Sequence, residues 1–458
     1  MIPNSANGVR GRRPSGPGKL LWAMVVAGVL GGMQVGAQAQ SLKELYEAAL
    51  AYDASYLAAL AQASAAPHRA AQTQALARPT LGLSTSATRS ESDPPGSLPR
   101  DRVGSTVLQT GLQARMSLFN RANAVSIEQA QRSLEVAQLD VAQAEQDLIV
   151  RVAQAYFDVL AAQDALATTQ ASKKAIGEQL ASAKRNFEVG TATITDTREA
   201  QSRFDLATAQ EIKADNDLRV AQVTLDQLVG RSGVQPKPLA QPVGLPAVPP
   251  GDVQAWVERA DAEHPAVRKA QIGLEVAELE VSKAKAGHLP TVDLSSTLGA
   301  QRLSGSQYVA AQRGTTPSAS LGVTVTLPVY SGGAVDARTR ETLALQEKSR
   351  QDLVATRRQV SEGTRRTFFG VQSLLAQVRA YEAAEASTKL ALESTQLGYK
   401  VGVRVNLDVL NAQTQLYTTQ RDLARARYDV LLNALKLRQA AGALTAEHVA
   451  ALNELLAP

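Results

Sequence analysis

The sequence contains no cysteine, which excludes disulfide bonds, thiol catalysis and cysteine-based metal sites. Histidines are also few, and they lie in unrelated contexts at His68, His264, His288 and His448. No two of them have the spacing of a metal site, and no Ser, His and Asp set falls within one compact segment. We interpret His264, which precedes a proline, as a structural residue at a helix start. We expect no enzymatic activity, no metal and no cofactor.

Aromatic residues make up only 4% of the chain, although 44% of it is hydrophobic. Most of the hydrophobic residues are Ala, Leu and Val. This composition has few of the bulky aromatic side chains that usually fill large globular cores. It suits long helices that pack closely through small side chains.

Long apolar runs are missing after residue 40, so the sequence predicts no membrane-spanning helix there. The one apolar run, "LLWAMVVAGVL" at 20–30, follows a basic leader and precedes "GAQAQS". This pattern is typical of a secretory signal peptide. We predict cleavage after Ala39, which removes residues 1–39; the alternative is a retained membrane anchor. No cysteine follows the cleavage site, so we expect no lipid anchor.

The excess of basic residues belongs mainly to the leader. The formal charge of the whole chain is +5, and the leader contains four basic residues and no acidic one. The predicted mature chain therefore carries a charge of +1. It has no basic stripe interleaved with aromatic residues, so we expect no nucleic acid partner.

Two halves of the chain repeat each other. With a shift of 211 residues, "ALARPTLGLSTS" at 75–86 aligns with "AGHLPTVDLSST" at 286–297. With a shift of 212, "RNFEVGTATITDTREAQSRFD" at 185–205 aligns with "LGYKVGVRVNLDVLNAQTQLY" at 397–417. A period of this length is too long for a solenoid. It indicates an internal duplication, with the proline-rich segment Val234–Gly251 as an extended linker between the copies.

Each copy predicts the same order of elements: a short helical region, two strands, then two long helices joined by a turn. The predicted parts are a first repeat at 40–245, a second repeat at 246–442 and a C-terminal tail at 443–458. The predicted strands span about 79–90 and 104–119 in the first repeat and 290–303 and 317–330 in the second. The predicted hairpin turns lie near 188–195 and 400–407.

The long helices are predicted from the absence of breakers. Residues 122–187 contain no proline and one glycine, with apolar residues at heptad spacing. As one helix they would span about 100 Å. The partner helices, at roughly 195–229 and 406–441, end at Gly230 and Gly442, which are typical helix stops.

The strands alternate apolar and polar residues. In "SASLGVTVTLPVY", Ser318–Tyr330, every second residue from Ala319 is apolar, and the others are mostly Ser, Thr or Gly. Segments of about ten residues with this pattern are typical of membrane β-barrels. Four strands cannot enclose a lumen, so copies of the chain would have to combine their strands. Two amphipathic hairpins on a soluble core are the alternative.

Two further expectations follow from a barrel. Phe119 and Tyr330, which are equivalent in the repeat, would lie at the same membrane interface. The polar loops between the paired strands, 90–104 and 303–317, would face the outside of the cell.

The duplicated arrangement and the motif "GYKVGVRVNLDVLNAQTQLY", followed by "ARARYDVLLNALKLRQAAG", resemble the TolC family of outer-membrane channel proteins over residues 41–445. The resemblance implies a mainly α fold with a membrane β-barrel: a homotrimer in which four strands per chain form a 12-stranded barrel in outer-membrane lipid. The long antiparallel coiled-coil helices would form a tunnel across the periplasm.

The resemblance also implies function and partners. The channel would be an exit duct for drug efflux or type I protein secretion. A periplasmic adaptor (membrane fusion) protein and an inner-membrane transporter of the RND, ABC or MFS type would recruit it. A periplasmic coiled-coil adaptor or structural protein without a channel is the alternative, although such a protein would not need four alternating strands.

Site residues follow from the same resemblance, position by position. It implies tip-closing links between Asp196 and Tyr399 and between Thr195 and Arg404. Capping of the helix by Thr195 or Asp196 is the alternative role. It also implies a pore constriction at Asp408, with Asn411 where the family has a second acidic residue. The adaptor would contact the hairpin turns, at Val189, Gly190, Val401 and Gly402.

Overall fold

The computed structural model describes residues 39–92, 103–240, 244, 249–305 and 314–457. Residues 40–458 form one compact unit, described below. The predicted signal peptide, except Ala39, and the central parts of both predicted outer loops lie outside the described residues.

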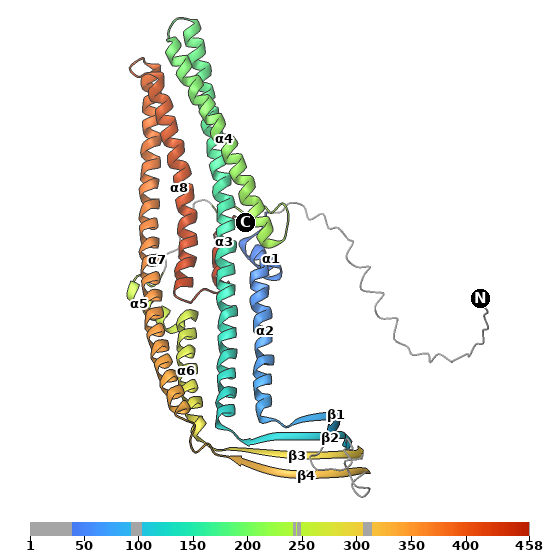
Figure 1. Ribbon diagram of the computed structural model, residues 1–458. Coiled ribbons are helices and arrows are strands. Elements are labelled where there is room, and N and C mark those ends of the chain that lie inside the picture. The colour runs from blue at the N-terminus through green and yellow to red at the C-terminus, as the bar shows by residue number, and fades with distance from the viewer. Residues whose placement is uncertain (1–38, 93–102, 241–243, 245–248, 306–313, 458) are drawn as a thin grey trace, which may run out of the picture. The chain divides into compact units, whose positions relative to one another are not determined.

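The two repeats build the same elements (Figure 1). In the first repeat, α1 (Leu42–Tyr52), α2 (Ala54–Gln74) and a 3-10 turn (Ala75–Ala77) precede the strands; α5 (Val253–Glu263), α6 (Pro265–Lys285) and a 3-10 turn (Ala286–His288) do so in the second. The His264 side chain caps α6, since its Nδ1 accepts a hydrogen bond of 3.1 Å from the Ala266 N–H. Burial lowers the pKa of His264, which keeps this acceptor neutral.

The long helices are continuous. They are α3 (Arg121–Glu188) and α7 (Ala334–Lys400), which return as α4 (Ile194–Val229) and α8 (Asn406–Ala440). We call α3 and α4 the first hairpin, and α7 and α8 the second hairpin. The first hairpin ends at Gly230, whose φ of 68° is left-handed, and Gly442 follows the second with a φ of 72°. Glycine adopts this conformation without steric cost, so both helices stop there.

The four strands form one antiparallel sheet in the order β1 (Thr80–Ser92), β2 (Val103–Phe119), β3 (Thr291–Gly305) and β4 (Gly314–Thr326). Its register follows the duplication. β1 pairs with β2 from Thr80 opposite Arg115, and β3 pairs with β4 from Thr291 opposite Thr326. The second register is the first one shifted by 211 on both strands. The repeat therefore extends to the hydrogen-bonded pairs of the sheet.

β4 differs from its predicted bounds of about 317–330, because it ends at Thr326. Pro328 follows two residues later, and a proline cannot donate the N–H that a strand ladder needs. The equivalent position in β2 is Ser117, where the register with β3 shifts. Tyr330 therefore lies outside the sheet, whereas its repeat equivalent Phe119 is the last residue of β2.

The main core joins both repeats to the end of the chain. Tyr156 and Phe157 of α3 are buried with Leu431 and Leu435 of α8. Val234 and Leu239 of the predicted linker are buried in the same cluster, as are residues of α9 (Ala446–Asn453) in the predicted tail. The linker also pairs, through Pro236, with Gln40 and, through Leu239, with Leu456. Residues 234–239 of the linker thus belong to the core of the protein and do not act as a free spacer.

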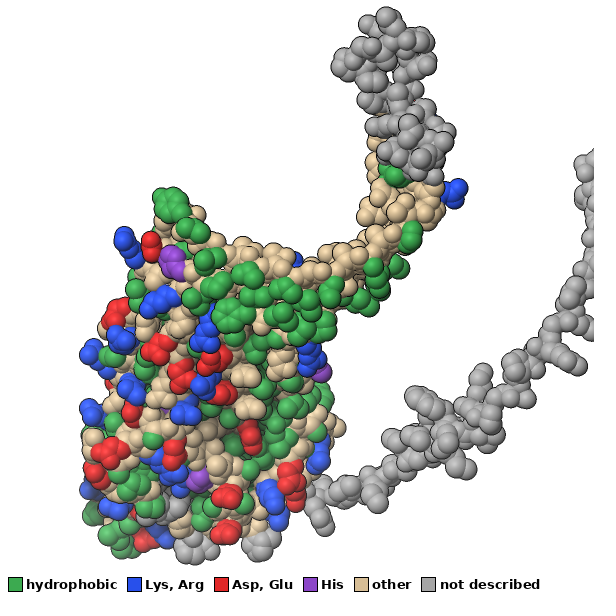
Figure 2. Space-filling model, turned by 90° about the horizontal axis from the view of Figure 1, so that it is seen from below, with side chains coloured by type: hydrophobic (Ala, Val, Ile, Leu, Met, Phe, Trp, Pro, Cys, Tyr) green, Lys and Arg blue, Asp and Glu red, His purple; other side chains and the backbone are tan. Residues whose placement is uncertain are grey.

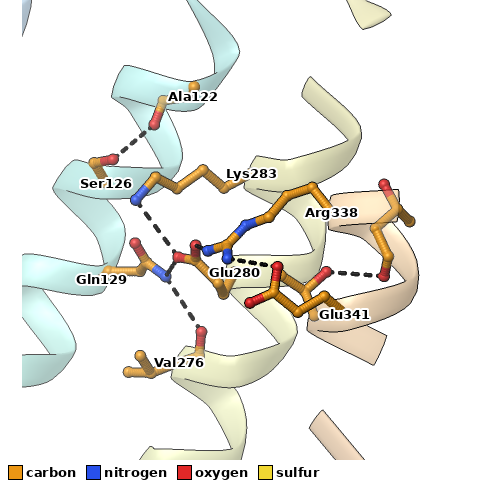
Figure 3. Close-up of polar contacts among 10 residues, drawn as sticks. Ala122, Ser126, Gln129, Val276, Glu280, Lys283, Arg338 and Glu341 are labelled. Atoms are coloured by element: carbon orange, nitrogen blue, oxygen red, sulfur yellow. Dashed lines mark hydrogen bonds and ion pairs between the residues drawn. The ribbon is translucent and has the colours of Figure 1, made fainter. Parts of the chain in front are cut away.

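A polar cluster joins the two repeats beside the sheet (Figure 3). Glu280 of α6 accepts hydrogen bonds from Gln129 Nε2 of α3 at 3.0 Å and from Arg338 Nη2 of α7 at 2.8 Å. The Gln129 bond and then the Arg338 bond lower the pKa of Glu280. α6 is therefore held against a long helix of each repeat.

A second polar contact fixes the junction of α1 and α2. Asp53, which is almost fully buried, caps α2 and accepts two hydrogen bonds from Arg151, of 2.8 and 2.9 Å. It also accepts bonds from the Tyr56 N–H and from Ser55. The Arg151 bonds hold the pKa of Asp53 well below its usual range. A bidentate Arg–carboxylate pair of this kind is among the stronger polar contacts in proteins.

We predict that Arg151→Gln lowers the free energy of unfolding by about 1–3 kcal/mol, because the buried carboxylate loses its charged partner. Urea denaturation in detergent, followed by circular dichroism, measures this. The loss of unfolding free energy should be complete above about pH 4 and become smaller at lower pH. The reason is that a carboxyl whose pKa is depressed in the folded state stabilises the fold only while it is ionised. Lys348→Gln, which breaks the exposed pair with Asp352, is the control and should have little effect. Equal effects of the two substitutions would contradict the prediction.

Candidate functional site at the ends of the two hairpins

The two hairpin turns share one backbone conformation. Gly190 and Gly402 have φ of 77° and 81°. In the first turn the N–H groups of Thr191 and Ala192 both donate to the Asn186 carbonyl, and in the second turn those of Val403 and Arg404 both donate to the Gly398 carbonyl. These positions correspond at the shift of 212. The duplication therefore preserves the shape of the turn, and the two ends differ in their side chains.

Three side-chain hydrogen bonds connect the hairpins near these turns. Asn186 Nδ2 donates to the Tyr399 hydroxyl at 3.1 Å, and Arg203 Nη2 donates to Asn411 Oδ1 at 3.0 Å. In the third bond, the side chain of Gln179 of α3 donates to Asn406 at the start of α8. An apolar contact accompanies them, because Leu410 of α8 is buried among α3 and α4 residues.

The four residues predicted as tip-closing links lie at these ends, but they do not pair with each other within one chain. Asp196 accepts from the Thr193 hydroxyl and backbone N–H, at 2.7 and 3.0 Å, and Thr193 caps α4. The N-cap residue is therefore Thr193 and not Thr195 or Asp196, although Asp196 takes part in the cap as the third residue of the capping box. Thr195 is exposed, and its side chain has no hydrogen bond among the described residues. Arg404 Nη1 lies 3.7 Å from Asp408 Oδ2.

The two residues predicted to constrict a pore also have partners within the chain. Asp408 accepts a hydrogen bond of 3.4 Å from the Val405 N–H at the start of α8. Its equivalent, Asp196, has a full capping box with Thr193, but Val405 occupies that place in the second hairpin and has no hydroxyl. Asn411 accepts its bond from Arg203 of the other hairpin. Asp408 is thus held less tightly than Asp196.

The turns predicted as adaptor contacts expose apolar side chains. Val189 is 72% exposed in the first turn, and Val401 and Val403 are 66% and 75% exposed in the second. Exposed valines gathered at a hairpin turn are unusual on a surface in water and are typical of a contact surface. Neither turn glycine would bring a side chain against a neighbour, but their positive φ disfavours any other residue.

Sequence reasoning missed Asn186, Arg203, Gln179 and Asn406, which form the contacts between hairpins. One signal was available for Asn186, because its equivalent in the second repeat is Gly398. An asparagine where the other copy needs no side chain indicates a contact that only one hairpin makes. The other three occupy ordinary helical positions, and only the packing of the hairpins reveals their partners.

The sheet at the opposite end of the hairpins has two distinct faces. Its pairing places uncharged polar and small residues on one face, with Arg115 and Asp293 as an ion pair of 3.1 Å among them. The other face carries Leu81, Leu83, Leu112, Leu294, Leu298, Leu321, Val323 and Val325. Figure 2 shows the sheet as an arm with few charged side chains, unlike the helical body. One face suits water and the other suits lipid.

The described part of the chain contains neither a candidate metal site nor a candidate membrane-spanning helix. No group of three or more His, Asp or Glu side chains there could hold a metal ion. No described helix is both long enough and apolar enough to cross a membrane.

A duplicated helical hairpin with a two-faced sheet defines a class of protein, the outer-membrane channels with a helical tunnel. The profile of the "Outer membrane efflux protein" family matches residues 45–231 and 256–443, and the chain belongs to this family. The chain is 32% identical to the outer membrane protein TolC of Vibrio cholerae, with 95% of this chain and 98% of TolC covered. It is 36% identical to the alkaline protease secretion protein AprF of Pseudomonas aeruginosa, over 65% of this chain and 62% of AprF.

The fold has solved counterparts. The outer membrane protein VceC of Vibrio cholerae is 21% identical and has a TM-score of 0.72, with 88% of this chain and 96% of VceC covered. The family consists of outer-membrane channel proteins and not of enzymes. The mainly helical fold with a four-stranded contribution to a barrel is therefore confirmed.

We predict that Asn186→Ala combined with Arg203→Met loosens the hairpin ends, because two of the three hydrogen bonds between them are lost. Each is worth about 0.5–1.5 kcal/mol, so the open form should become about 5 to 150 times more populated. Trypsin should then cleave purified protein faster after Lys400 and Arg404. Arg219→Met, whose ion pair with Asp215 lies within α4, is the control. Unchanged cleavage in the double variant would show that these bonds do not hold the ends together.

Proposed function

We propose that three copies of the chain form a channel through the outer membrane and that their hairpins form its tunnel in the periplasm. The observation that carries the proposal is the sheet, with one apolar face, one polar face and two edges that have no strand partner among the described residues. An open sheet of four strands exposes unpaired backbone groups at both edges. In lipid such edges are too costly, and closure with other copies removes them.

The hairpin ends support the rest of the proposal. They combine exposed valines at the turns with polar links between hairpins that can open. The valine turns, with Gly190 and Gly402, would receive a periplasmic adaptor, which brings an inner-membrane transporter of the RND, ABC or MFS type to the duct. The channel itself would remain passive.

Two kinds of cargo fit a passive duct: drugs and secreted proteins. Similarity to AprF, named for alkaline protease secretion, and to the outer membrane efflux proteins supports both. The experiment is to delete the gene and measure antibiotic susceptibility together with the set of secreted proteins. Restoration of either phenotype by the intact gene supports the duct. A deletion that changes neither contradicts it.

Asp408 offers a test at the proposed constriction. Three copies of this carboxylate around a narrow opening would attract cations. We predict that Asp408→Asn lowers the cation preference of single channels in planar bilayers and weakens block by multivalent cations severalfold. Asp408→Glu retains the charge and should behave like the natural protein. The same reversal potential in all three would show that Asp408 does not line the opening.

Tyr399 offers a second test, on closure. Tyr399→Phe removes the acceptor of the Asn186 bond, and Arg404→Ser removes the partner of Asp408. We predict that the double variant conducts more current per channel than the natural protein and still forms a stable trimer. Unchanged conductance in a folded trimer would show that these two side chains do not hold the tip closed.

A further inference from the structure

The apolar face of the sheet carries little charge, and all of it lies at one end. Within the described parts of the four strands, the charged residues on this face are Arg89 and Glu91 of β1 and Arg302 of β3. They lie at the end of the sheet that is farthest from the helices (Figure 1). The other charged residues of the sheet, Arg115 and Asp293, pair with each other on the polar face. Charge on the apolar face is therefore confined to one level of the sheet.

This level coincides with the outer edge of the apolar band. Phe119 lies opposite Val292 at the helical end of the sheet, and Arg302 lies ten residues further along β3. Ten residues of an antiparallel strand rise about 34 Å, which at a tilt of about 40° is about 26 Å along the axis of a barrel. The apolar band of an outer-membrane barrel is about 25 Å tall. With Phe119 at the inner boundary of the lipid, Arg302 therefore reaches the headgroups of the outer leaflet.

The two arginines are close enough to bind one group. Arg302 lies opposite Leu108 of β2, and Arg89 lies opposite Thr106, the next residue of β2 on the same face. β1 and β3 are two strand spacings apart, so the two Cα atoms are separated by about 12 Å, which two extended arginine side chains can cover together. Thr106 and Ser304, which stand beside them, are small. A headgroup can therefore approach both guanidinium groups from the lipid side.

The charges around the two arginines favour an anion. Arg302 has no acidic partner among the described residues. Arg89 lies 3.3 Å from Glu91, but both side chains are more than half exposed, and an ion pair of this kind contributes little. The cluster of two arginines and one glutamate keeps a net positive charge. A guanidinium also presents parallel N–H groups that match the oxygens of a phosphate.

We propose that Arg89 and Arg302 bind the phosphate groups of the phosphorylated glycolipid of the outer leaflet, lipopolysaccharide. This inference rests on the proposed function, which places the sheet in the outer membrane with its loop end toward the outside. An arginine on the lipid face of a barrel is costly at the middle of the bilayer and costs little at its edge. A phosphate at that edge turns the position into a binding contact, and the carboxylate of Glu91 opposes it.

Lipid binding to purified protein tests the proposal. The probes are lipid A with its phosphates and the same lipid A without them, each added to delipidated protein in detergent with a chelator, so that no divalent cation bridges the charges. Native mass spectrometry measures the amount bound. We expect the natural protein to bind the phosphorylated lipid about tenfold more tightly. An arginine that only extends into water at the membrane edge would not distinguish the two lipids.

The variants have opposite expected effects. Arg89→Gln with Arg302→Gln should abolish the preference, either substitution alone should lower it in part, and Glu91→Gln should increase it. Arg115→Gln is the matched control, because this exposed arginine belongs to the same sheet but to its polar face, and it should leave the preference unchanged.

A preference that survives in the double variant, or that the natural protein lacks, would overturn the site. Equal binding of phosphatidylglycerol would also overturn it, because the arginines would then bind any lipid phosphate. Current through planar bilayers, measured on the same preparations, separates this proposal from the proposed function. Conducting channels without a lipid preference would overturn the site alone, whereas a preference in protein that conducts no current would contradict the channel and not the site.

Discussion

Backbone hydrogen bonding at the edges of the sheet is the constraint on which the rest of the structure depends. Among the described residues, β2 and β3 have partner strands on both sides, whereas β1 and β4 have one on only one side. A β-strand in lipid has no water to satisfy its outer N–H and C=O groups. The apolar face of the sheet is suited to lipid, and its two outer edges need further strands to satisfy their backbone groups. The two features together require several copies around one axis.

The side chains of the long helices, like the edges of the sheet, need partners from outside their own hairpin. A hairpin of two long helices buries only part of its surface against itself, and the rest must come from the other hairpin or from another copy. Inside the chain, buried aromatic residues such as Tyr156 and Phe157 gather where both repeats meet α1 and α9. Away from this core, small residues such as Ala183 and Ala200 let the helices approach closely. The scarcity of aromatics therefore reflects a structure with one large core, a few smaller buried clusters and long helical hairpins.

Most of this architecture could be predicted from the sequence, because its signals are local. Absence of proline predicts the long helices, glycines at 230 and 442 predict the ends of their partner helices, and alternation of apolar and polar residues predicts the strands. The end of β4 was missed by four residues, although Pro328 was visible, because the alternation of side chains continues past it. The buried role of Val234 and Leu239 could not be predicted, since only the folded core shows what a proline-rich segment packs against.

The candidate site was predictable in place but not in its contacts. The repeated turn located both hairpin ends, yet the partners of Tyr399 and Asn411 depend on how the two hairpins pack against each other, which no local pattern contains. The duplication also explains why the ends differ. Two identical turns would make six equal contacts in a trimer, and nothing would favour one hairpin as the moving part. Thr193 ties the first turn to Asp196 through a capping box, whereas Val405 gives Asp408 only a backbone bond of 3.4 Å, beside the long ion pair with Arg404. The second hairpin is therefore the less constrained of the two. Its end is where a small amount of binding energy from a partner would shift the hairpin most easily.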